Sequence, residues 1–221
     1  MVEVTVGMVT LGFFIAAFSA LFTIMNPLST ASVFLTITKG DSLAKRRNIA
    51  LKACIAAALV LLAFAMAGNL ILYFFGITVD AFRIAGGLLI TRVGFGMLYP
   101  KKEAGEEKRE KEAEQKDDIS LIPLAIPMLS GPGAMTTAIV LMGEAGGWAG
   151  ANYWLIGSVF LAIIGVSALS YVILRQSISI QKYIGENERA VIDKILGLIV
   201  MVIGIQFIIN GLAGWLSGIF G

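Results

Sequence analysis

The stretch MNPLSTAS (residues 25–32) interrupts an apolar segment that covers residues 8–37. A second stretch, MLSGPGAMTT (residues 128–137), interrupts another apolar segment at residues 119–142. Proline has no backbone N–H and disturbs a helix, and lipid supplies no water to bind the freed carbonyls, so such breaks survive only inside protein or beside a water-filled cavity. Two breaks in corresponding places of two half-chains are typical of transporters that bind their substrate at the membrane midplane.

Composition indicates a membrane protein. The chain has 221 residues, of which 57% are hydrophobic and 14% are charged, whereas a soluble domain has about 25% charged residues. The charges are clustered, and the remaining apolar runs are long enough to cross a hydrocarbon core of ~30 Å. We therefore expect an all-α polytopic membrane protein.

The apolar runs predict six membrane spans, at residues 8–37, 48–75, 79–99, 119–142, 151–174 and 191–217. The first run has about 30 residues and would extend ~45 Å as one straight helix, which exceeds the thickness of the bilayer core. A helix broken at Asn26-Pro27 into two arms resolves this excess. The fourth run contains Pro123, Pro127 and Pro132, so we expect helices 1 and 4 to be discontinuous.

Basic residues predict the orientation. All Lys and Arg residues except Arg83 lie in or beside the three segments that follow spans one, three and five. Cytoplasmic loops carry the Lys/Arg excess, so these loops are predicted to be cytoplasmic and both termini to lie outside the cell membrane.

Three spans in each half would insert the second half upside down relative to the first. Glycines seven residues apart recur in the third span of each half, as Gly87 and Gly94 and as Gly197 and Gly204. The predicted organisation is a first inverted repeat at 1–99, a charged cytoplasmic linker at 100–118 and a second inverted repeat at 119–221.

The spans contain few groups that could perform acid–base or metal chemistry. Asp193 is predicted near the inner face, while Asp80, Arg83 and Glu144 are predicted near the outer face. This pattern argues against a pump built on buried carboxylates. The chain has no histidine and one cysteine, so we expect no zinc site, no cofactor and no enzymatic activity.

Broken helices supply partial charges without ionisable side chains. The N-terminus of a half-helix favours a carboxylate, and free carbonyls at the end of the preceding arm can hold an ammonium group. Two antiparallel breaks thus suit a small zwitterion, although Pro-Gly motifs can also merely kink helices for packing. The candidate binding residues are Asn26, Pro27, Ser29, Thr30, Ser130, Gly131, Pro132, Gly133 and Thr136.

Five further residues are candidates for lining a pathway, namely Thr23, Gly87, Gly94, Gly204 and Gln206. Each has a simpler structural interpretation. Glycines at this spacing allow two helices to approach closely, and an amide such as Gln206 can form a hydrogen bond between helices.

The sequence also resembles the MarC family. The resemblance is carried by NPLSTASVFLTIT (residues 26–38), AGGLLITRVGFGML (85–98), IPLAIPMLSGPGAMTTAI (122–139) and IGIQFIINGL (203–212). It implies six spans, an inverted repeat and, since the family includes archaeal small neutral amino acid transporters, transport of glycine or alanine by at least some members. It places Asn26, Pro27, Ser29 and residues 130–133 at the family's motifs.

The expected function is secondary transport of small neutral amino acids such as glycine or alanine. An ion channel, or an exporter of another small solute that uses the same broken-helix site, is the alternative. The coupling ion is left open between Na⁺ and H⁺, as is homo-oligomer formation. The expected partners are the amino acid and the lipid bilayer, with no nucleic acid.

Overall fold

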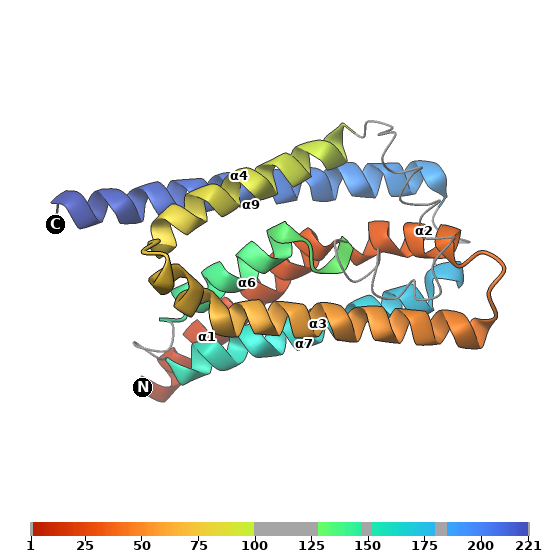
Figure 1. Ribbon diagram of the computed structural model, residues 1–221, viewed down its shortest axis with the longest axis horizontal. Helices are drawn as coiled ribbons and strands as arrows, with labels where there is room; N and C mark the ends of the chain where they lie inside the picture. Colours follow the sequence, from red (N-terminus) through yellow and green to blue (C-terminus); the bar gives the residue numbers. More distant parts are fainter. Residues whose placement is uncertain (1, 100–127, 147–151, 180–184, 221) are drawn as a thin grey trace.

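The computed structural model describes residues 2–99, 128–146, 152–179 and 185–220, and Figure 1 shows a bundle of helices. No strand occurs among these residues, so the predicted all-α class is confirmed for them. The predicted linker 100–118 and the first part of the fourth predicted span, including Pro123 and Pro127, lie outside them. The helices, in chain order, are α1 (Val2–Met25), α2 (Pro27–Ile37), α3 (Leu43–Phe74), α4 (Val79–Leu98), α6 (Pro132–Glu144), α7 (Tyr153–Arg175) and α9 (Glu186–Phe220).

Polar side chains set the starts of three helices. Ser42 precedes α3 and its hydroxyl accepts a hydrogen bond from the N–H of Lys45 at 3.3 Å. Thr78 caps α4 in the same way, and the Asn152 side chain caps α7. Each cap provides an acceptor for a backbone N–H group that has no partner inside its helix.

Five helical stretches in the described residues are long and apolar enough to cross a membrane, namely Gly7–Ile37, Leu43–Phe74, Val79–Leu98, Tyr153–Arg175 and Ala190–Gly218. The shortest of these has 20 residues, which at ~1.5 Å per residue spans a hydrocarbon core of ~30 Å. Large apolar side chains stay exposed along them, such as Leu59 on α3 and Ile164 on α7. In a membrane these side chains would face lipid.

Both chain termini lie at one end of the bundle (Figure 1). The opposite end holds the turn between α2 and α3, the end of α4 and the end of α7. The described residues that precede the three predicted basic segments therefore share one end of the bundle. We call this the basic end and the other the terminal end.

α4 and α9 pack along each other and lie beside the group formed by α1, α3, α6 and α7 (Figure 1). Glycines bring their backbones into contact. A Cβ atom on Gly87 would lie 2.5 Å from the carbonyl oxygen of Gly204, and one on Gly94 would lie 2.6 Å from that of Gly197. Only hydrogen in place of a side chain permits this approach.

The core of the bundle consists largely of small and branched apolar residues. Ala53, Ala57 and Ala65 on α3 and Ala162 and Val166 on α7 are fully buried. α3 and α7 contact each other, and each also contacts one of the helices that follow the sequence breaks, α6 and α2 respectively. The helices that follow the two breaks therefore pack against other helices of the bundle.

Candidate functional site

The first break is a single residue wide. α1 ends at Met25, α2 begins at Pro27, and Asn26 between them has φ 42° and ψ 65°. Asn26 is the only residue other than glycine with a positive φ in the described part of the chain. Asparagine tolerates this left-handed conformation better than most residues, and Pro27 fits the first position of the helix that follows.

A chain of hydrogen bonds runs from this break to the last helix. The Asn26 carboxamide oxygen accepts a hydrogen bond from the Ser29 N–H at 3.3 Å. The Asn26 Nδ2 donates a second hydrogen bond to the Ser29 hydroxyl at 2.6 Å. The Ser29 hydroxyl in turn donates to Oδ1 of Asp193 on α9 at 2.5 Å. Asn26 is buried, whereas Ser29 and Asp193 are half-buried, so the chain leads outward from the packed interior.

The second break lies just before α6. Ser130 forms a bend, and Gly131 adopts an extended conformation with φ −63° and ψ 171°. α6 then begins at Pro132, and no side chain caps its first turn. The N–H groups of Gly133 and Ala134, in that first turn, consequently receive no side-chain cap, in contrast to the N–H of Ser29 in α2.

The two breaks are neighbours inside the bundle. A Cβ atom on Gly133 would lie 3.3 Å from Cγ2 of Ile24 and 3.7 Å from Cγ1 of Ile90. Ile24 stands two residues before Asn26, so the start of α6 packs against the end of α1. From this region α2 runs toward the basic end and α6 toward the terminal end (Figure 1).

Several polar groups at the two breaks are buried. Thr30 is 2% exposed, and Ser130 and Thr137 are fully buried. The Thr30 hydroxyl donates to the Asn26 carbonyl at 3.1 Å, and the Thr137 hydroxyl donates to the Gly133 carbonyl at 2.8 Å. Thr136 is also buried, and a Cβ atom on Gly86 of α4 would clash with its methyl group.

Comparison with known proteins identifies the family. The model of the family described as MarC family integral membrane protein matches residues 11–216. The chain belongs to the MarC family. The predicted resemblance is thus confirmed, and so is the prediction of an integral membrane protein.

Several curated members of the MarC/UPF0056 group are similar over nearly their whole length. A UPF0056 membrane protein of Methanocaldococcus jannaschii is 39% identical over 208 residues, covering 92% of this chain and 98% of the relative. The UPF0056 membrane protein YvbG of Bacillus subtilis is 34% identical, covering 91% of this chain and 95% of the relative. No solved structure matches the chain.

In this MarC family member, the candidate pathway residues occupy different surroundings. Thr23 is buried, and its hydroxyl donates to the Ser19 carbonyl within α1 at 2.7 Å. Gly87, Gly94 and Gly204 lie in the contact between α4 and α9. Gln206 is exposed, and its Nε2 donates to Oδ1 of Asn210 one turn later at 2.7 Å.

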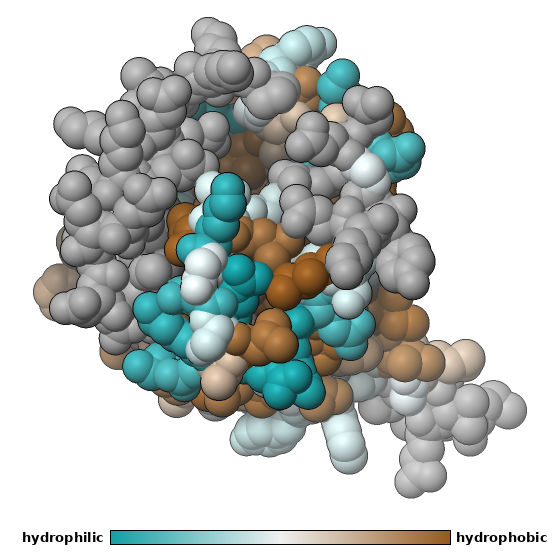
Figure 2. Space-filling view, turned by 90° about the vertical axis from the view of Figure 1, so that its right-hand side faces the viewer, coloured by the Kyte–Doolittle hydropathy of each residue, from teal (hydrophilic) through white to brown (hydrophobic). Residues whose placement is uncertain are grey.

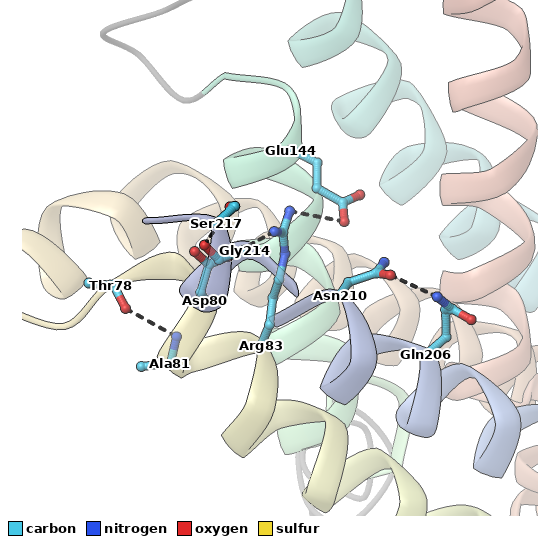
Figure 3. Close-up of polar contacts among 9 residues, drawn as sticks. All are labelled: Thr78, Asp80, Ala81, Arg83, Glu144, Gln206, Asn210, Gly214 and Ser217. Atoms are coloured by element: carbon cyan, nitrogen blue, oxygen red, sulfur yellow. Dashed lines mark hydrogen bonds and ion pairs between the residues drawn. The ribbon is translucent and has the colours of Figure 1, made fainter. Parts of the chain in front are cut away.

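A second polar cluster lies where α4 begins and α6 ends, and Figure 3 shows its side chains. The Arg83 guanidinium on α4 contacts Asp80 Oδ1 at 3.1 Å and Glu144 Oε1, at the end of α6, at 3.2 Å. Burial raises the pKa of the Glu144 carboxyl above its ordinary value, and Arg83 opposes part of that rise. The cluster joins α4 to α6 by charge.

Sequence reasoning did not place Asp193 beside the first break. Span six was predicted to start at residue 191. Asp193 follows that start by two residues, so it was expected near the inner membrane surface. α9 in fact begins at Glu186, which sets Asp193 two turns inside the helix and beside Ser29. The available signal was an acidic residue, Asp193, with apolar residues on both sides of the Asp193-Lys194 pair.

Proposed function

We propose that this protein is a secondary transporter of small neutral amino acids of the glycine and alanine class. The substrate would bind where α2 and α6 begin, between the first and fourth predicted spans, which are discontinuous in this proposal. The observation that carries the proposal is the juxtaposition of the two breaks, one of which is linked by hydrogen bonds to the Asp193 carboxylate.

The pattern of helix contacts supports an inverted repeat. If the two halves are exchanged, α4 and α9 exchange places, as do α3 and α7, and each of these two pairs is in contact. The contact of α3 with α6 then corresponds to the contact of α7 with α2, which is also present. Likewise, the Gly87–Gly204 contact corresponds to the Gly94–Gly197 contact. Repeats of this kind place substrate sites at their interface.

The two breaks offer complementary chemistry for a zwitterion. The uncapped N–H groups of Gly133 and Ala134 stand at the positive end of α6, which suits the substrate carboxylate. Asp193 and the carboxamide oxygen of Asn26 are acceptors that suit the substrate ammonium. The Ser29 hydroxyl accepts a hydrogen bond from Asn26 Nδ2 and donates one to Asp193, and it can reorient toward the substrate.

The packing around the breaks favours a small substrate and an occluded site. Gly133 leaves little space beside Ile24, so a large amino acid side chain would not fit without displacement of the helices. Burial of Thr30 and Ser130 is typical of a carrier that opens to one side at a time. A channel would instead expose such groups along a continuous pore.

Asp193 also provides a candidate for ion coupling. A carboxylate that holds the substrate ammonium can carry a proton or contribute an oxygen ligand to Na⁺. Protonation would remove the charge that attracts the ammonium group. Coupling by H⁺ and coupling by Na⁺ can therefore both be tested at this one side chain.

The proposed setting is the cell membrane, with the basic end in the cytoplasm and both termini outside. Both termini lie at the same end of the bundle, which supports their placement on the same side of the membrane. The Lys/Arg excess at the opposite end supports the assignment of that end to the cytoplasm. The proposal involves neither catalysis nor a cofactor.

Uptake of labelled glycine into proteoliposomes tests the proposal. We expect saturable uptake that unlabelled alanine inhibits and leucine inhibits much less. Asp193→Asn should abolish the stimulation by an imposed pH or Na⁺ gradient. Ser158→Ala is a control variant, because the Ser158 hydroxyl donates within its own helix, to the Trp154 carbonyl at 2.9 Å, near the start of α7. Uptake that never saturates, together with steady ionic current, would show a channel.

A further inference from the structure

A small basic cavity lies at the basic end, apart from the two breaks. Its volume is about 50 Å³, and it is lined by residues of α2, α3, the end of α7 and the segment just after α7, namely Phe34, Leu43, Arg46, Arg47, Leu174, Arg175, Ser177 and Ile178. A cavity needs at least ~10–15 Å³ to hold one water. The cavity thus has room for a group the size of a phosphate.

Three guanidinium groups from two helices converge on this cavity. Arg46 and Arg47 stand in the second turn of α3, and Arg175 is the last residue of α7. The Arg46 Nε donates to the Thr38 carbonyl at 3.0 Å, which fixes the guanidinium plane. Among the described residues, no acidic side chain forms an ion pair with any of the three. Their charge is therefore available to an anion.

The other side of the cavity is apolar. Phe34 and Leu174 are buried, while Leu43 is 62% exposed at the start of α3. Figure 2 shows this end of the molecule, where hydrophilic residues gather beside apolar ones. An oxyanion with a hydrocarbon chain attached matches this combination better than a free ion does.

We propose that this cavity binds the phosphate group of an anionic phospholipid from the adjacent membrane leaflet. The three guanidinium groups would donate hydrogen bonds to the phosphate oxygens. The acyl chains would follow the apolar wall past Leu43 into the bilayer. Basic pockets between helices on the cytoplasmic side are known to hold such head groups. The bound lipid would join α3 to α7, two helices that contact each other and pack against the helices that follow the breaks.

General attraction between basic loops and an anionic membrane is the competing explanation. It depends on the number of charges at this end and not on where they stand. Lys39, Arg92 and Lys194 are three exposed cations of the same region that do not line the cavity. They provide a charge-matched control.

The test is thermal unfolding of the purified full chain in detergent, titrated with phosphatidylglycerol, phosphatidylcholine or inorganic phosphate. A ligand of the folded state raises the melting temperature. We expect saturable stabilisation by phosphatidylglycerol alone. The triple variant Arg46→Gln/Arg47→Gln/Arg175→Gln should bind it at least tenfold more weakly, whereas Lys39→Gln/Arg92→Gln/Lys194→Gln should stay within twofold of the parent.

A variant with one change keeps the test usable if the triple variant does not fold. Arg175 is exposed at the end of its helix, and Arg175→Gln should lower the affinity about fivefold, the equivalent of ~1 kcal/mol per cation near the surface. Equal losses of phosphatidylglycerol affinity in the two triple variants would overturn the proposal in favour of general electrostatic attraction. Equal stabilisation by inorganic phosphate would overturn the lipid as the ligand.

Discussion

The hydroxyl of Ser29 donates a 2.5 Å hydrogen bond to the carboxylate of Asp193, joining residues 164 positions apart. Ser29 is the third residue of the helix that follows the first break, and Asp193 lies on the last helix of the chain. The contact places the negative charge of Asp193 beside an interruption of the backbone. The proposed site depends on this arrangement.

Loss of either partner should weaken substrate binding. A hydrogen bond to a charged group contributes ~1.5–3 kcal/mol, so Ser29→Ala and Asp193→Asn should each raise the KM for glycine about 10- to 100-fold. The double variant should lose less than the sum of the two, because each change removes the same contact. Uptake kinetics in proteoliposomes measure all three.

Lys194→Gln is the control for these variants, because it changes the charge of the next residue, whose side chain is exposed. Its KM should match that of the parent. If the Ser29 and Asp193 losses add fully, the two side chains act independently, and the proposed hydrogen-bonded unit is wrong.

The contribution of the Asn26 backbone conformation to stability can be separated from the contribution of its side chain to binding. Asn26→Ala should destabilise the protein by ~2 kcal/mol, because alanine disfavours the left-handed conformation and cannot cap α2. Asn26→Gly should lose under ~1 kcal/mol, since glycine accepts a positive φ. Both variants should lose glycine binding, because both lack the carboxamide. Thermal unfolding and equilibrium binding separate the two effects, and a glycine variant with normal affinity would exclude the side chain from the site.

Glycines of α4 should differ sharply in their tolerance of alanine. Gly94→Ala would push a methyl group against the backbone of α9 and should cost ~1–3 kcal/mol or more. Gly96→Ala is the matched control, because nothing lies within 4 Å of its Cβ position. It should be neutral or stabilise the helix by up to ~1 kcal/mol. Equal melting temperatures for the two variants would contradict the close packing of α4 against α9.

Glu144 should make stability depend on pH. It lies at the end of α6, beyond the predicted fourth span, and burial raises its pKa in the folded state above the ordinary value. The folded protein therefore keeps the proton to a higher pH than the unfolded chain does. The stability gained from protonation is complete below the ordinary pKa and is lost as pH rises through the folded-state pKa.

Glu144→Gln stays neutral at every pH and should remove this part of the pH dependence. Melting temperatures measured from pH 4 upward should therefore decline less steeply in the variant than in the parent. A variant with an unchanged slope would show that Glu144 titrates as it does in the unfolded chain.

Local chemistry made much of this fold predictable from the sequence. The apolar runs indicate helices because lipid offers no hydrogen-bond partner to the backbone, which must then bond within the helix. The proline motifs locate the end of α1 and the start of α6 to within a residue or two. The glycines seven residues apart correctly indicate a face of close helix contact. These features depend only on neighbours in the sequence.

Contacts between distant helices were not predictable in the same way. The Ser29–Asp193 bond depends on how α9 is placed against α2, and the Arg83–Glu144 pair depends on the approach of α4 to α6. The apolar stripes of these helices are similar enough that several pairings would bury them equally well. Asp193 therefore looked like a surface residue until its neighbours were known.

Equilibrium binding of labelled glycine to the purified protein tests the central claim most directly. We predict one saturable site that alanine competes for, with affinity at least tenfold weaker in both Ser29→Ala and Ser130→Ala, one variant from each break, and unchanged in Ser158→Ala. Unchanged affinity in both break variants would contradict a site shared between the two breaks.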